Sequence, residues 1–243
     1  MNENNILSQE YLPRVLILIL RTHLFSTHKV FDVAAVLLID KIALFQKDDL
    51  GHLMYGVVEN LCDDSVEIDM KSERIITKAV AFLKRLYDLK RDELPSVMDL
   101  FGRVARAPRP CVLYVMSGLR SGFECDLPFC RDLVARYSSF FEEFFDTKSD
   151  SCAAVDAILY FISTFADILL EVRYEKTISK LSQVIESFTP DQIIYAHKNL
   201  SLCADAVRRC LGRVPQELHK RLGAWLRGPD VAGISRRLVD GEE

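Results

Sequence analysis

The sequence lacks the short motifs that mark common kinds of active site. It contains no glycine-rich phosphate loop, no His-Glu-x-x-His, no Gly-x-Ser-x-Gly and no Cys-x-x-Cys. Such motifs hold a phosphate, a zinc ion, or an activated serine or thiol in a fixed geometry. We therefore predict no catalytic and no cofactor-binding residues, and expect a protein that is not an enzyme.

Long hydrophobic runs are also missing. Among the longest are Val15–Leu20 and Val33–Ile39, far short of the roughly 20 apolar residues that a membrane-spanning helix needs. Residues 1–8 are polar and acidic, unlike the basic start and apolar centre of a secretion signal. We expect a soluble intracellular protein, cytoplasmic or nuclear, with no transmembrane segment.

A metal site has little support among the 7 cysteines and 5 histidines. Cys125 and Cys130 lie close together with Cys111 not far before them, but no histidine is near them in sequence. Structural zinc needs four well-placed ligands. The odd number of cysteines and their apolar surroundings predict buried thiols in a reducing compartment, without metal.

The charge is nearly balanced overall but unevenly distributed. Residues 122–175 contain eleven acidic and four basic side chains, whereas residues 205–239 contain eight basic and three acidic ones. A nucleic-acid surface usually carries a denser basic stripe. The distribution argues against a nucleic-acid partner and leaves an acidic region and a basic region for protein partners or for each other.

Apolar residues recur at helical spacing through most of the chain, which predicts an all-α fold. We expect about ten to twelve helices, in one multi-helical domain or in two fused helical halves. The periodic segments lie at 12–19, 31–45, 50–61, 72–86, 96–105, 133–145, 155–169, 178–188, from 191 and from 215.

Two helix starts have strong local signals. Ser96 and Asp99 have the spacing of a capping box, in which each side chain bonds to the other residue's backbone N–H. Thr189, Pro190 and Gln192 combine a capping hydroxyl, a proline at the first helical position and a reciprocal cap.

Prolines and glycines gather near the middle of the chain, at Pro108, Pro110, Gly118 and Gly122. They suggest a break between helical halves. We predict an N-terminal half at 1–107, a connecting segment at 108–128, a C-terminal half at 129–227 and a loose tail at 228–243. Residues 112–116, inside the connecting segment, are too few to assign to helix or strand.

An aromatic band, Tyr137–Phe145, is predicted to lie on one helix. Core packing is the favoured interpretation because aromatic residues dominate ordinary cores. The alternative is a groove for an apolar ligand or a partner's helix, with Phe141 and Phe144 as partner-binding candidates, since five aromatics in nine residues cover more than one narrow stripe.

The segment 216–227 has the pattern of a basic amphipathic helix. Lys220, Arg221 and Trp225 are candidates for binding an acidic partner or a membrane surface. The alternative, which we favour, is a final helix that Trp225 packs onto the domain, because short isolated helices are marginal unless packed.

Short stretches resemble a cyclin box. Arg14 with the following Val-Leu-Ile-Leu is similar to the first cyclin helix, and residues 38–41 are similar to the second. The resemblance, over about residues 12–200, implies a cyclin-like fold in which Arg14 and Asp40 pair. Asn60 stands where the family carries a kinase-contacting lysine, so the resemblance does not extend to kinase activation.

A stack of antiparallel helix pairs, as in HEAT-like scaffolds, explains the same periodicity. Both architectures bind partners through helix faces. The sequence therefore favours a non-enzymatic protein-interaction subunit, regulatory or scaffold. A HEAT-like adaptor in a larger assembly and a helical enzyme with a dispersed active site are the alternatives.

Overall fold

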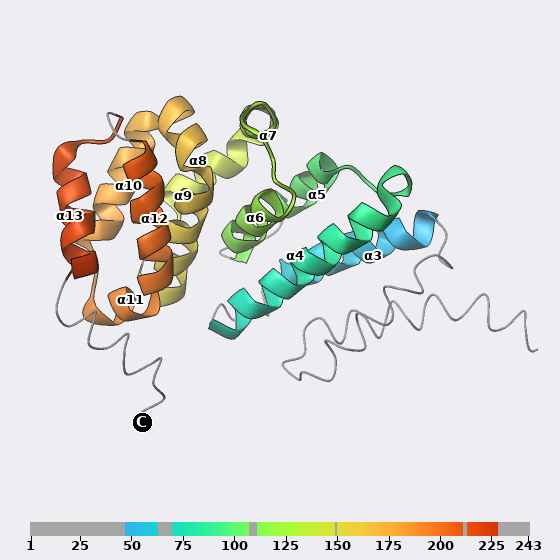
Figure 1. Ribbon diagram of the computed structural model, residues 1–243, viewed down its shortest axis with the longest axis horizontal. Coiled ribbons are helices and arrows are strands. Elements are labelled where there is room, and N and C mark those ends of the chain that lie inside the picture. Colours follow the sequence, from blue (N-terminus) through green and yellow to red (C-terminus); the bar gives the residue numbers. More distant parts are fainter. Residues whose placement is uncertain (1–46, 63–69, 107–110, 149, 211–212, 228–243) are drawn as a thin grey trace, which may run out of the picture. The chain divides into compact units, whose positions relative to one another are not determined.

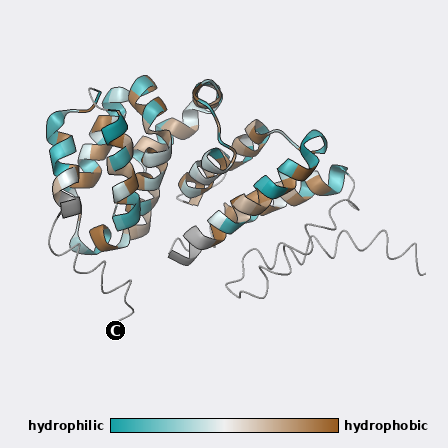
Figure 2. Cartoon of the chain, viewed as in Figure 1, coloured by the Kyte–Doolittle hydropathy of each residue, from teal (hydrophilic) through white to brown (hydrophobic). Residues whose placement is uncertain are grey.

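The computed structural model describes residues 47–62, 70–106, 111–148, 150–210 and 213–227. Within these ranges the chain forms eleven α-helices and one short 3-10 helix, with no strand. The predicted all-α fold is confirmed. The helices predicted at 12–19 and 31–45, and the tail at 228–243, lie outside the described residues. Hydrophobic and hydrophilic residues alternate along the helices, as expected of amphipathic elements (Figure 2).

The chain divides into two compact units, residues 1–108 and 109–243. The segment 108–128 was expected to connect them, but most of it belongs to the C-terminal unit. Helix α6 (Cys111–Gly122) lies there, and its residues from Cys111 to Leu119 are all buried. The apolar residues 112–116, too few to assign from sequence, are the middle of this helix and part of the core.

The described part of the N-terminal unit contains α3 (Lys47–Leu61), α4 (Met70–Lys90), the 3-10 helix η2 (Arg91–Glu93) and α5 (Val97–Val104). The predicted capping box at Ser96 and Asp99 is confirmed at the start of α5. The fully buried residues of this unit include Leu50, Leu53, Leu83, Leu86 and Phe101.

One arginine joins α5 to α3 at the surface of this unit. The Arg103 guanidinium lies 3.9 Å from the centre of the Tyr55 ring. The same group is 2.5 Å from a carboxylate oxygen of Glu59. Arg103 therefore packs on an aromatic face and pairs with a charge, two interactions that lysine makes less well.

The C-terminal unit surrounds one long helix (Figure 1). That helix is α9 (Cys152–Val172), which packs most extensively on α12 (His197–Arg209) and α6. The remaining helices are α7 (Leu127–Arg136), α8 (Ser138–Asp146), α10 (Tyr174–Glu186), α11 (Pro190–Tyr195) and α13 (Gln216–Arg227). The capping box predicted at Thr189 and Gln192 is confirmed, with Pro190 as the first residue of α11.

Helix α9 is the one helix among the described residues that is long and apolar enough to span a membrane. The search for uninterrupted apolar runs does not find this helix, because Asp156, Ser163, Thr164 and Asp167 interrupt its sequence. Within the unit 72% of its most apolar window is buried. This burial is typical of the central helix of a folded core, which passes the same test of length and composition.

The helix predicted at 133–145 is divided at Tyr137, because α7 ends at Arg136 and α8 begins at Ser138, and the four phenylalanines of the aromatic band all lie on α8. Its rings pack against Phe161 and Phe165 of α9. Phe144 and Phe161 have ring centres 4.7 Å apart, and Phe141 lies 5.9 Å from both Phe161 and Phe165. Phe141 and Phe144 are fully buried, so these two partner-binding candidates belong to the core.

Replacing Phe141 with alanine should lower the free energy of unfolding by about 3–5 kcal/mol, because it removes a fully buried ring and leaves a cavity. Phe145→Ala is the matched control, since that ring is only partly buried, and should cost less than half as much. Chemical denaturation of the two variants measures both values. Equal losses would contradict this account of the aromatic core.

Candidate functional site

Helix α9 carries a polar face along its otherwise apolar length. Its polar residues recur every three or four positions, which places them on one side of the helix. They are Asp156, Tyr160, Ser163, Thr164, Asp167 and Glu171. Asp156, Tyr160, Asp167 and Glu171 have partners on α6, α7 or α12. The Ser163 and Thr164 hydroxyls donate to the Tyr160 carbonyl of α9 itself.

The buried end of this face centres on Asp156. Its carboxylate accepts hydrogen bonds from the Tyr114 hydroxyl of α6 and, at 2.8 Å, from the Asn199 amide of α12. The ring of Tyr114 also contacts the ring of Tyr160, with 5.5 Å between centres. Because a buried carboxylate without partners is costly, these contacts fix how α6 and α12 align with α9.

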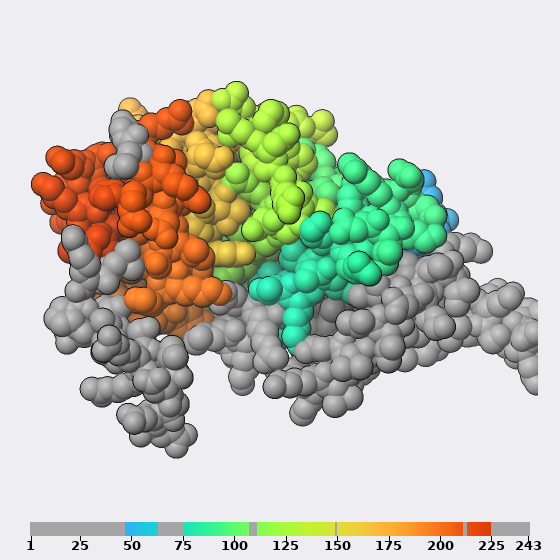
Figure 3. Space-filling model, viewed as in Figure 1, coloured from blue at the N-terminus to red at the C-terminus, as the bar shows by residue number. Residues whose placement is uncertain are grey.

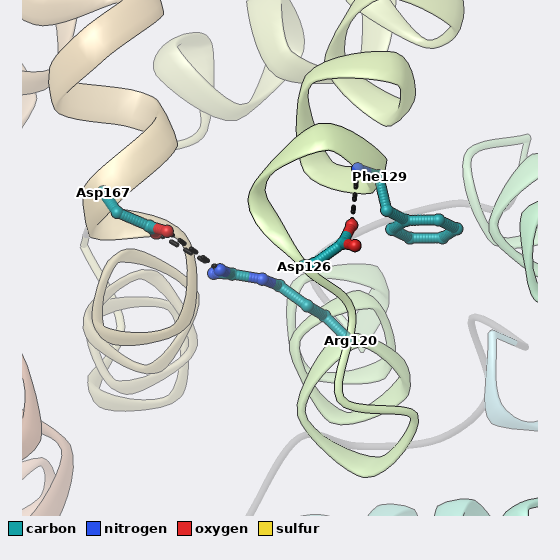
Figure 4. Close-up of polar contacts among 4 residues, drawn as sticks. All are labelled: Arg120, Asp126, Phe129 and Asp167. Atoms are coloured by element: carbon teal, nitrogen blue, oxygen red, sulfur yellow. Dashed lines mark hydrogen bonds and ion pairs between the residues drawn. The ribbon is translucent and has the colours of Figure 1, made fainter.

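Arg120 holds the outer end of the face (Figure 4). It reaches from α6 to α9, where Nη2 lies 3.2 Å from both carboxylate oxygens of Asp167. Its guanidinium lies 4.9 Å from the centre of the Phe165 ring. Only 12% of the side chain is exposed. A second ion pair, between Arg131 of α7 and Glu171, lies further along α9.

A pocket of about 330 Å³, here called the Arg120 pocket, opens beside these groups. Its wall on α9 consists of Tyr160, Ser163 and Thr164, and its wall on α12 consists of Leu202 and Arg209. The end of α6 and the residues after it supply Arg120, Ser121, Glu124 and Cys125. Figure 3 shows α6, α9 and α12 side by side at the surface, with α9 between the other two. The volume falls within the range of small-ligand pockets.

The rim of the pocket follows a tight connection between α6 and α7. Cys125 N–H donates to the Arg120 carbonyl and Glu124 N–H to the Ser121 carbonyl, the pattern of a Schellman motif. The left-handed position of that motif, where glycine is preferred, is Glu124 with φ 50°. Asp126 then caps α7 by accepting from the Phe129 N–H at 2.9 Å (Figure 4).

Two thiols lie beside this connection. Cys125 immediately precedes Asp126, the capping residue of α7, and Cys130 is the fourth residue of that helix. Apolar side chains at these two positions commonly pack against each other. Burial, and next the proximity of Cys130, raise the pKa of Cys125 to about 12. Burial likewise raises the pKa of Cys130, although the nearby Arg120 opposes it. Both thiols stay protonated at neutral pH.

A second groove, between α8 and α10, contains a buried lysine. The Lys180 ammonium donates to the backbone carbonyls of Phe145, at 3.2 Å, and Thr147. It therefore satisfies carbonyl groups at the end of α8, as a C-terminal cap does. Burial lowers its pKa, while Asp146 and Asp150 oppose the change. These contacts give Lys180 a structural role.

Helix α13 packs on α10 and α12, with Leu218 and Leu222 buried. The candidates Lys220 and Arg221 are exposed, and Arg221 pairs with Glu186 of α10 at 3.2 Å. The side chain of Trp225 lies outside the described residues. Lys220 and Arg221 are thus on the outer side of a packed helix and do not line the Arg120 pocket.

Sequence reasoning missed the pocket because it followed the apolar positions of α9. The available signal was the polar series itself, in which Asp156 and Asp167 lie three helical turns apart on one face. No group of three or more metal-binding side chains occurs in the part of the chain that the structure describes. No protein-family model, curated protein or solved structure gives a significant match to this chain.

Replacing Glu124 with glycine should stabilise the protein by about 0.5–1 kcal/mol, because glycine adopts a left-handed conformation without steric cost. Glu124→Ala keeps the Cβ atom and should give no such gain. Thermal unfolding of the three proteins checks the expectation. Destabilisation by glycine would show that the carboxylate supports the fold.

Cys125 should react with iodoacetamide more slowly than a free thiol at pH 7.5, since the thiolate is the nucleophile and the pKa of Cys125 is raised. Its rate should still be rising at pH 10. Mass spectrometry of the labelled peptide gives the rate at each pH. Fast labelling that levels off above pH 8 would contradict the raised pKa.

Proposed function

We propose that this chain is a non-enzymatic helical interaction subunit, regulatory or scaffold, whose C-terminal unit binds a segment of a partner protein across the Arg120 pocket. The observation that carries the proposal is Leu202, a large apolar side chain that is 42% exposed at the pocket wall. The neighbouring apolar residues of α12, Leu200, Cys203 and Val207, are all buried.

The surroundings of Leu202 support a binding role. A single exposed leucine is ordinary on a protein surface. This one lies on a helix face with Lys198, Asp205 and Arg209, which are three, four or seven residues away and all exposed. An apolar centre with a charged rim beside a concave surface is the usual arrangement at protein interfaces.

Cyclin-like regulation is a narrower form of this proposal. Arg14 and Asp40, the pair that the resemblance implies, lie outside the described residues. The Asn60 amide donates to the Gly56 carbonyl of its own helix at 2.6 Å. Partner binding at α12 needs neither a cyclin box nor a HEAT-like stack, because it depends on the C-terminal unit alone.

Replacing Leu202 with aspartate tests the proposal. The tagged full-length chain, purified from its native cells, should retain a stoichiometric partner, and Leu202→Asp should reduce that retention at least tenfold. A photocrosslinking residue at position 202 should form a covalent adduct with the same partner. Quantitative mass spectrometry measures both outcomes.

Val172→Asp is the matched control, since Val172 is 46% exposed in the same unit. It lies eight residues beyond Thr164, about 12 Å further along α9. Circular dichroism should show all variants folded. Equal loss of the partner in both variants, or undiminished retention by Leu202→Asp, would refute binding at this surface.

A further inference from the structure

The Arg120 pocket brings together two arginines from different helices. Asp167 binds Nη2 of Arg120, which leaves the N–H groups at the other end of the guanidinium. Nη1 is buried and forms no hydrogen bond to a nitrogen or oxygen atom of the described residues, and the Cys130 thiol lies beside the same guanidinium. A buried donor without an acceptor is unfavourable, so Arg120 keeps hydrogen-bonding capacity that the described chain does not use, and a ligand reaches Nη1 once the side chains that cover it move aside.

Arg209 supplies the second guanidinium. It is exposed on α12, lines the pocket and forms no ion pair with any of the described residues. The adjacent Arg208 differs, because it is 2.5 Å from a carboxylate oxygen of Asp205 and does not line the pocket. Ser121 adds a hydroxyl at the wall.

We propose that the pocket binds the phosphoryl group of a phosphorylated side chain in the partner segment, an inference that rests on the proposed function. A phosphoryl group has three strong acceptor oxygens and a charge near −2 at neutral pH. Arg120, Ser121 and Arg209 offer donors from two helices, and arginine binds such oxygens in bidentate geometry. A carboxylate has one oxygen and one charge fewer to match them.

Leu202 lies beside the same pocket and would contact the residue next to the phosphorylated one. The charge, the donor set and the exposed leucine thus describe one ligand: a phosphorylated side chain followed or preceded by an apolar one.

Glu124 provides a test in which a substitution should strengthen binding instead of weakening it. Glu124 lines the pocket, and its negative charge disfavours an anion bound there. Neutralising it should strengthen binding, whereas neutralising Arg209 should weaken it. A purely structural role for either residue would not produce opposite effects on one ligand.

Binding is measured with phenyl phosphate, inorganic phosphate and benzoate as probes, using leucine-methyl NMR of the full-length chain at constant ionic strength. Phenyl phosphate should give saturable shifts of the Leu202 methyl signals, inorganic phosphate weaker ones, and benzoate the weakest. Arg209→Gln should raise the Kd for phenyl phosphate about tenfold, as expected for a lost hydrogen bond to a charged group. Glu124→Gln should lower the Kd about threefold.

Arg208→Gln is the matched control and should leave the Kd unchanged. The proposal is overturned if phenyl phosphate causes no saturable shift, if benzoate binds as tightly, or if Arg208→Gln weakens binding as much as Arg209→Gln. Non-specific attraction to basic side chains would produce the last result.

Phosphatase treatment of the lysate before capture separates this inference from the proposed function. Capture that depends on Leu202 and is lost after treatment supports both. Capture that depends on Leu202 but survives treatment leaves the interaction surface standing and overturns the phosphorylated ligand. Saturable phenyl phosphate binding without any Leu202-dependent capture refutes the proposed partner and overturns the phosphorylated partner segment with it.

Discussion

The enclosure of α9 is the constraint on which the C-terminal unit depends. Helices pack around it, so every polar group that it buries needs a partner inside the protein. Asp156 meets this need through Tyr114 and Asn199, which come from two different helices. Sliding either helix along α9 would break a hydrogen bond to a buried carboxylate. The polar contacts thereby specify an alignment that apolar packing alone would leave open.

The same face changes character toward its outer end. Asp167 is only partly buried, and its partner Arg120 forms part of a pocket wall. Arg120 therefore both orders the core, by packing on Phe165 and pairing with Asp167, and shapes the surface. Glu124 occupies a backbone position that favours glycine, and this local strain occurs at the rim of the same pocket. Strain of this kind often accompanies functional sites.

Much of the fold could be predicted from the sequence, because helix periodicity and caps are local signals. Ser96 with Asp99, and Thr189 with Gln192, identified two helix starts correctly. The role of Cys111–Gly122 could not be predicted in the same way, since its glycines and the prolines just before it, Pro108 and Pro110, resemble a linker, while its burial depends on α9. The division between α7 and α8 at Tyr137 could not be predicted, because the helical spacing of apolar residues continues across it.

The candidate site was harder to predict than the fold. Arg120, Tyr160 and Arg209 are far apart in sequence, and only the packing of three helices brings them to one pocket. Phe141 and Phe144 were difficult for the opposite reason. The number of aromatic residues close together in sequence suggested that some rings lie at the surface, but α9 covers these two. A charge count found a basic C-terminal region, yet it gave no means of telling Arg209 from Arg208, which differ in the direction that each faces.

The order of the helices along the chain has a consequence for synthesis. Helix α12, which packs most extensively on α9, ends at Arg209, some forty residues after α9 is complete. During translation α9 therefore emerges well before its main partner, with the apolar surface that α12 covers still exposed and its buried aspartate short of the Asn199 amide. A cellular factor that recognises apolar helices has that interval in which to bind it. The unit can close only when most of the chain has left the ribosome.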